Sequence, residues 1–268
     1  MAIRTDLAME AKALWEKSAE KTTKLEGVRA SERDGVTLVE ILDEKGSTAL
    51  GKPIGRYLTM ELQKYCTDVR KTAEKLARQL ENLIDWEPHR NVLVIGLGNR
   101  AVTPDALGPM TVEKLLLTRH MIQTLPQQFG FCRSVSALTP GVLATTGIET
   151  LETVKGAVEH VKPDCLIAVD ALAAGSMQRL CNTVQISDSG IAPGSGVGNR
   201  REAFDWETLN IPVYAIGVPT VVDSQTDDHM IVTPKDIDAR VNFLSSVLAG
   251  GLNLVLHPEF DYDDFAQF

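Results

Sequence analysis

The stretch NVLVIGLGNRAVTPDALGP, residues 91–109, decides the fold. Four apolar residues follow Asn91, a pattern typical of a parallel strand that is buried on both faces. Glycines then turn the chain, and Asp105 follows a proline at the start of a predicted helix over residues 105–120. A buried strand that leads through glycines into a helix indicates an α/β sheet.

The same alternation of strands and helices continues toward the C-terminus. Continuous apolar runs bounded by turn residues predict strands, and apolar residues at helical spacing predict helices. Strands that alternate with helices predict an α/β sheet with helices on both faces. The predicted strands are RSVSAL (133–138), DCLIAVDAL (164–172), NTVQISD (182–188) and IPVYAIGVPTVV (211–222), and the helices are IETLETVKGAVEHV (148–161) and PKDIDARVNFLSSVLAGGLNLVL (234–256).

The residues before this sheet predict two helices and a β-structured excursion. The excursion contains the strand VTLVEIL and a turn at Glu44–Ser47. No repeat or low-complexity segment divides the chain, so we expect a single domain. The expected parts are a helix over 6–24, the β-rich excursion over 27–60, a helix over 64–84, one domain over 1–268 and an acidic tail over 258–268.

Composition limits the classes of function. The net charge of −9 argues against direct nucleic-acid binding, because phosphates would be repelled. No stretch reads as a membrane span, and the charged N-terminal residues lack a secretory apolar region, so we expect a cytoplasmic protein. The four cysteines, at 66, 132, 165 and 181, show no metal-like spacing and are expected to be reduced and buried.

Two acidic residues are the candidate catalytic groups. Asp105 follows the first strand, and Asp170 ends the apolar run of a later one. Ligands of open α/β sheets bind at the carboxyl ends of strands, so the two carboxyl groups are expected to converge there. Two such carboxyl groups share one proton and activate a water between them. The alternative for each aspartate is a helix cap.

Glycine-rich loops supply the candidate oxyanion and substrate-binding groups. A lone Gly-Leu-Gly-Asn is a weak nucleotide motif, because the third residue after Gly98 is Ala101 rather than glycine. Tight turns are the alternative role for these glycines. The functional hypothesis is that backbone amides of these loops bind a tetrahedral oxyanion. The residues selected for that role are Gly98, Asn99, Gly194, Ser195 and Gly196.

Six strings in chain order together resemble the germination protease family of spore-forming bacteria. They extend from Arg4 to the closing helix and cover nearly the whole chain. Long ordered strings of this kind are specific to one family. The strings are RTDLAMEA, GLGNRAVTPDALGP, TGIET, VDALAAGSMQRLCNTVQISDSGIAPGSGVGNRR, AIGVPTVVD and MIVTPKDID.

The resemblance implies an atypical aspartic endopeptidase that begins the degradation of small acid-soluble spore proteins during germination. It also implies a three-layer α/β/α sandwich similar to the hydrogenase maturation proteases, a zymogen, a homotetramer and a location in the spore core. The family's two catalytic carboxylates fall on Asp105 in VTPDALGP and Asp170 in VDALAA. No cofactor is expected. The family's usual histidine before the PGSG loop is Ala192 here.

Two other functions stay open on the sequence. One is a metal-dependent maturation-type protease, in which Asp105 and Asp170 are metal ligands. The other is a family member that binds spore proteins without cutting them.

Overall fold

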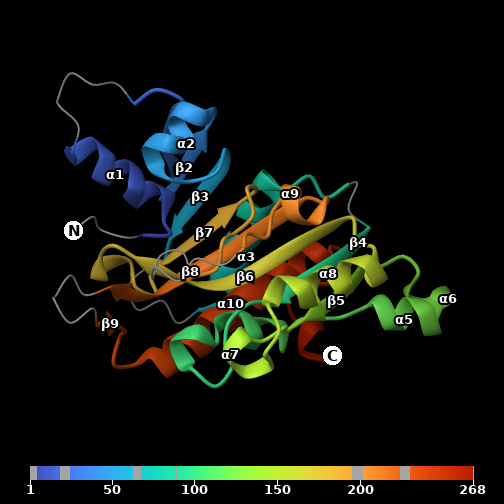
Figure 1. Ribbon diagram of the computed structural model, residues 1–268. Coiled ribbons are helices and arrows are strands. Elements are labelled where there is room, and N and C mark those ends of the chain that lie inside the picture. Colours follow the sequence, from blue (N-terminus) through green and yellow to red (C-terminus); the bar gives the residue numbers. More distant parts are fainter. Residues whose placement is uncertain are drawn as a thin grey trace.

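The computed structural model describes most of the 268 residues as a layered α/β structure (Figure 1). The described ranges are 5–18, 25–62, 68–87, 90–194, 202–223 and 230–267.

One mixed sheet of nine strands runs through the described part of the chain. Its order is β1-β2-β3-β7-β8-β6-β4-β5, and β9 pairs with β8. β4, β5, β6 and β8 are parallel, whereas β7 lies antiparallel between β8 and β3. The strands are β1 (Val28–Arg33), β2 (Val36–Ile41), β3 (Gly55–Glu61), β4 (Asn91–Gly96), β5 (Ser134–Leu138), β6 (Cys165–Ala174), β7 (Thr183–Ser187), β8 (Val213–Asp223) and β9 (Ile231–Val232).

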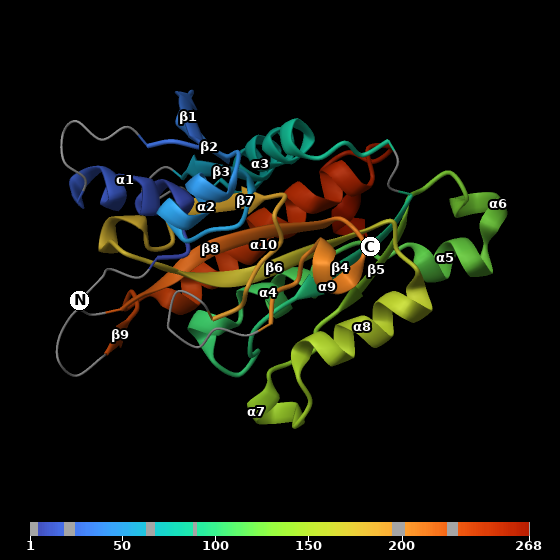
Figure 2. The ribbon, with the colours of Figure 1, turned by 45° about the horizontal axis from the view of Figure 1, so that its top comes forward.

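Helices cover both faces of this sheet, which confirms the predicted three-layer α/β/α sandwich (Figures 1 and 2). One face packs against α3 (Val69–Leu83), α4 (Leu107–Val112) and α10 (Ile237–Leu256). The other face packs against α8 (Thr150–Val161). Alternate residues of β4 and β6 enter the two cores, which is the reason that these strands are apolar throughout.

Short helices complete the structure. They lie between the strands or beside the sheet, and they are α1 (Ala8–Ser18), α2 (Glu44–Leu50), α5 (Arg119–Thr124), α6 (Pro126–Phe129), α7 (Leu143–Thr146) and α9 (Trp206–Leu209). The predicted helix over 105–120 is wrong in its length. A 3₁₀ turn, Thr103–Asp105, precedes the six residues of α4, and α5 begins only at Arg119.

The N-terminal strands extend the main sheet. β1, β2 and β3 form an antiparallel meander, and β3 joins it to β7. The predicted turn at Glu44–Ser47 is wrong, because these residues open α2. Asp43 caps that helix by accepting a hydrogen bond from Gly46 N at 3.0 Å. Gly46 also packs closely, since a Cβ there would lie 2.3 Å from the Gly27 carbonyl oxygen.

Helix α10 is long and apolar enough to cross a bilayer by length and composition alone. It is a core helix, since 67% of an apolar 18-residue window within it is buried inside the protein. Packing against α3 and the sheet explains this composition.

The last described residues fold back on the end of α10. His257 is fully buried there, with its Nε2 3.0 Å from the Leu116 carbonyl oxygen. The rings of Phe260 and Phe265 lie 6.3 and 6.5 Å from the His257 ring. A 3₁₀ turn, Asp264–Gln267, closes this segment.

Candidate active site

Asp105 lies in the loop that leaves the end of β4. The Leu97 amide donates to the Val169 carbonyl oxygen at 2.8 Å, which fixes the start of this loop against β6. The loop then closes on itself, since Asn99 N donates to Asp105 Oδ2 at 2.8 Å and to the Asp105 carbonyl oxygen at 3.1 Å. The half-buried Asp105 carboxyl group is therefore held in one position by the backbone.

Two glycines permit this compact loop. Gly98 has a φ of +109°, and a Cβ there would lie 2.1 Å from the Asp105 carbonyl oxygen and 2.9 Å from Asp105 Oδ1. Gly108, in the first turn of α4, lies so close to the sheet that a Cβ would be 2.3 Å from Leu97 O and 2.5 Å from Val169 O. These close approaches place the loop and α4 directly against the carboxyl ends of β4 and β6.

Asp170 lies inside β6 rather than at its end. It is the sixth of ten residues, and the strand continues to Ala174, two residues beyond the predicted end at Leu172. The pairing of β4 with β6 stops at Gly96 and Val169, while β8 accompanies β6 further. Asp170 is thus the first residue of β6 beyond the end of β4, and its side chain is only 5% exposed.

Burial and neighbouring groups shift the pKa of both carboxyl groups. Burial raises the pKa of Asp170 well above its usual value, and the charge of Asp105 raises it further. The Ala171 amide donates to Asp170 Oδ1 at 2.8 Å and partly opposes this effect. Burial also raises the pKa of Asp105, while the hydrogen bond from Asn99 N lowers it. The structure therefore brings the two predicted aspartates within electrostatic reach, in environments of different polarity.

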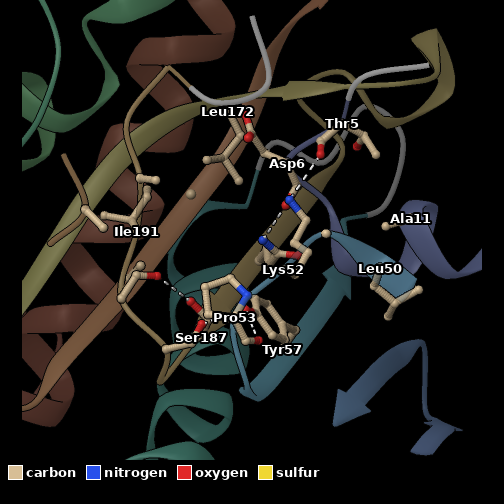
Figure 3. A pocket seen from close by; sticks show the side chains of 18 of the residues that line it. Thr5, Asp6, Ala11, Leu50, Lys52, Pro53, Tyr57, Leu172, Ser187 and Ile191 are labelled. Carbon is tan, nitrogen blue, oxygen red and sulfur yellow. Dashed lines mark hydrogen bonds between the residues drawn. The ribbon is translucent and has the colours of Figure 1, made fainter. Parts of the chain in front are cut away.

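A cavity of about 870 Å³ opens beside Asp170 (Figure 3). Its walls come from β6, β7 and β8, from the N-terminal segment and α1, and from the loop between α2 and β3. Polar groups from these elements converge on it, among them Asp6, Lys52 and Ser187. Asp105 is not among the lining residues, so the cavity presents Asp170 directly and Asp105 approaches it from the loop after β4.

The predicted oxyanion residues have different positions. The Asn99 amide is already bonded to Asp105, so the structure gives it a positioning function instead. The Gly98 amide donates no hydrogen bond to any described residue and stays a candidate. Gly194 lines the cavity with a φ of +72°, whereas Ser195 and Gly196 lie outside the described residues.

Several polar residues of this cavity were not predicted as site residues, and three of them lie close together. Asp6 and Lys52 line it, and Gln185 of β7 joins them. Burial lowers the pKa of Lys52, while the charge of Asp6 raises it. The only sequence signal was the presence of Asp6 in the string RTDLAMEA, because these residues reach the site through contacts distant in sequence.

Metal-ligating side chains do not gather around Asp170 or at another place in the described ranges. Among these residues, no group of three or more His, Cys, Asp or Glu side chains has the arrangement of a metal site.

The fold and the site define a class of protein: an α/β sandwich with buried carboxyl groups in a cavity at the carboxyl edge of its parallel strands. A family model described as "Germination protease" matches residues 4–229. The chain belongs to the germination protease family, a family of peptidases.

Individual relatives agree with this membership. The germination protease of Caldanaerobacter subterraneus subsp. tengcongensis is 41% identical, over an alignment that covers 96% of this chain and 95% of that protein. The germination protease of Clostridium perfringens is 37% identical over 99% of this chain and 98% of that protein.

Among solved structures, the chain is similar to the [NiFe] hydrogenase maturation protease HycI from Thermococcus kodakarensis KOD1. The identity is 19% and the TM-score 0.38, over 62% of this chain and 95% of that one. A likeness this low carries no argument about mechanism or substrate.

Proposed function

We propose that this protein is an endopeptidase in which Asp105 and Asp170 activate a water molecule. The observation that carries the proposal is the burial of Asp170 in the wall of the large cavity, where the charge of Asp105 adds to the effect of burial. The raised pKa favours the protonated form of Asp170, which is the form that acid catalysis needs.

The two environments assign the two catalytic functions. Asp105 is half-buried and accepts the Asn99 amide hydrogen bond, which stabilises its carboxylate form. It therefore acts as the general base that takes a proton from water. Asp170 acts as the general acid, which polarises the scissile carbonyl and then protonates the leaving amine. Each function is expected to contribute about 100-fold or more to the rate.

Backbone amides beside the pair are suited to the oxyanion. The Gly98 amide lies in the loop that holds Asp105, and Gly194 lies on the cavity wall. Amide donors of this kind lower the barrier by about 3–4 kcal/mol in comparable enzymes. A cavity of about 870 Å³ accommodates several residues of an extended peptide.

The relatives' name supports a germination-specific substrate. We propose that the substrates are small acid-soluble spore proteins, that the enzyme acts in the cytoplasm of the spore core, and that it assembles as a homotetramer. No nucleic acid, membrane or cofactor is part of the proposed reaction.

Cleavage of a small acid-soluble spore protein, followed by mass spectrometry, tests the proposal. The unmodified protein should produce discrete peptides, and Asp105→Asn and Asp170→Asn should each reduce the rate about 100-fold or more while leaving the fold intact. Asp238→Asn is the matched control, because Asp238 is an exposed residue in the first turn of α10 and should not affect cleavage.

The other candidate functions give different results in the same assay. Loss of activity with a chelator, and its recovery with nickel, zinc or manganese, would favour the metal-dependent protease. Intact substrate held in a stable complex would favour a binding protein. Full activity of Asp170→Asn would contradict the carboxyl pair.

A further inference from the structure

The N-terminal segment binds the strand that carries Asp170. Asp6 N donates to the Ala173 carbonyl oxygen at 2.9 Å, and Ala173 N donates to Asp6 Oδ2 at 2.9 Å. Gln185 secures the same segment from β7, since its Nε2 donates to Asp6 O at 3.0 Å and its Oε1 accepts from Ala8 N at 2.8 Å. Asp6 is thus fixed beside β6, three residues beyond Asp170.

Asp6 and Asp170 share one cavity. Both line it, and Lys52 lies on the same wall, where its Nζ donates to the Thr5 carbonyl oxygen at 3.1 Å. In Figure 3 the Lys52 side chain extends toward the backbone of Thr5 and Asp6. A third acidic group and one basic group therefore accompany the two proposed catalytic residues.

We propose that Asp6 is a positioning residue of this site, which holds the N-terminal segment on β6 and places a negative charge on the cavity wall that it shares with Asp170. The inference rests on the proposed function only in naming Asp170 as the acid. The electrostatic relation between the two side chains stands without it.

The charged groups that face Asp170 come from two elements. Asp105 approaches from the 3₁₀ turn after β4, and Asp6 from the N-terminal segment. Burial has the largest effect on the pKa of Asp170, and the charges of Asp105 and Asp6 raise it further. Asp205 also lines the cavity, but its carboxyl group accepts from Thr208 N at 2.9 Å as the cap of α9. Lys52 faces Asp6 and balances part of its charge.

Glu10 offers a matched control on the same segment. Its Oε2 accepts from Gly175 N at 2.7 Å, just as Asp6 Oδ2 accepts from Ala173 N, so both acids hold the end of β6. Glu10 does not line the cavity and is not among the groups that act on the pKa of Asp170. Asp6→Asn and Glu10→Gln therefore weaken similar attachments, but only the first removes a charge that faces Asp170.

The test is the protonation midpoint of Asp170 in the full chain. It is read from the carboxyl ¹³C shift in aspartate-labelled protein, assigned by comparison with Asp170→Asn, and from the high-pH limb of kcat/KM. Asp6→Asn should move both to lower pH, because a repelling charge is lost. Glu10→Gln should leave both midpoints in place.

Each outcome decides the matter. Equal midpoints in Asp6→Asn and Glu10→Gln would reduce Asp6 to a structural attachment and overturn the proposal. If Asp6→Asn does not fold, Asp6→Ser replaces it, because a serine hydroxyl also accepts a hydrogen bond but carries no charge, and an unmoved midpoint there overturns the proposal in the same way. If the unmodified protein cuts no peptide but the ¹³C midpoint moves in Asp6→Asn, the proposed function fails while the electrostatic inference stands.

Discussion

Replacing Gly98 with alanine should displace Asp105 and so test the geometry of the site. The φ of +109° is unfavourable for alanine, at a cost of about 1–2 kcal/mol. The new Cβ would lie 2.1 Å from the Asp105 carbonyl oxygen, so the backbone of Asp105 must move. That movement breaks the hydrogen bond from Asn99 N to the carboxyl group, which contributes about 1.5–3 kcal/mol.

The two effects together predict a loss of about 2.5–5 kcal/mol in the free energy of unfolding. Gly147→Ala is the matched control. Gly147 has a φ of +71°, but no atom lies within 4 Å of its Cβ position, so only the backbone cost of about 1–2 kcal/mol applies. Urea unfolding measures both variants. Peptide cleavage should fall about 100-fold in Gly98→Ala alone, because a displacement of about 1 Å in a catalytic group is that costly.

Equal stability of the two alanine variants, with cleavage retained in Gly98→Ala, would refute this reasoning. Asp105 would then not depend on the close approach of residue 98. If both variants lose the same stability but only Gly98→Ala loses cleavage, the loop has adjusted to the new Cβ and Asp105 has not returned to its position.

Three further predictions concern stability. Burial raises the pKa of Asp170 in the folded state, so the stability present below about pH 4 is lost as the pH rises toward the folded-state value. Asp170→Asn should therefore gain stability relative to the unmodified protein as the pH rises above about 4, and a pH-independent difference would contradict this. Leu76→Ala should lower the free energy of unfolding by about 2–5 kcal/mol in urea, because the fully buried Leu76 of α3 packs against Gly251 of α10. Asp43→Ala should cost about 0.5–2 kcal/mol and Asp43→Asn much less, because only the second keeps an oxygen that caps α2; equal losses would mean that the cap does not stabilise the helix.

The sequence predicted the layers because their cause is local. Runs such as NVLVI are apolar on both faces, and a strand of that kind needs helices on both sides. The antiparallel direction of β7 was not predictable from its residues, because direction depends on the path of the chain between strands. The turn predicted around Gly46 was wrong for a related reason. That glycine allows a close contact with Gly27 rather than a turn.

The site was predictable only in part. Asp105 and Asp170 follow apolar runs in strands that proved to be neighbours, so their approach follows from general sheet geometry. Asp6 could not be found in this way, because its bond to Ala173 joins residues 167 positions apart. Nor does the sequence show that β6 continues beyond the end of β4. That difference makes Asp170 the first residue of β6 without a β4 partner.

That difference in strand length also gives the two aspartates separate supports. The backbone of Asp170 is held by pairing with β8, as part of the sheet. Asp105 is held from within its own loop, by the Asn99 amide and by the close approach of Gly98. A change in the loop after β4 will therefore alter the spacing of the two carboxyl groups while the sheet keeps its geometry.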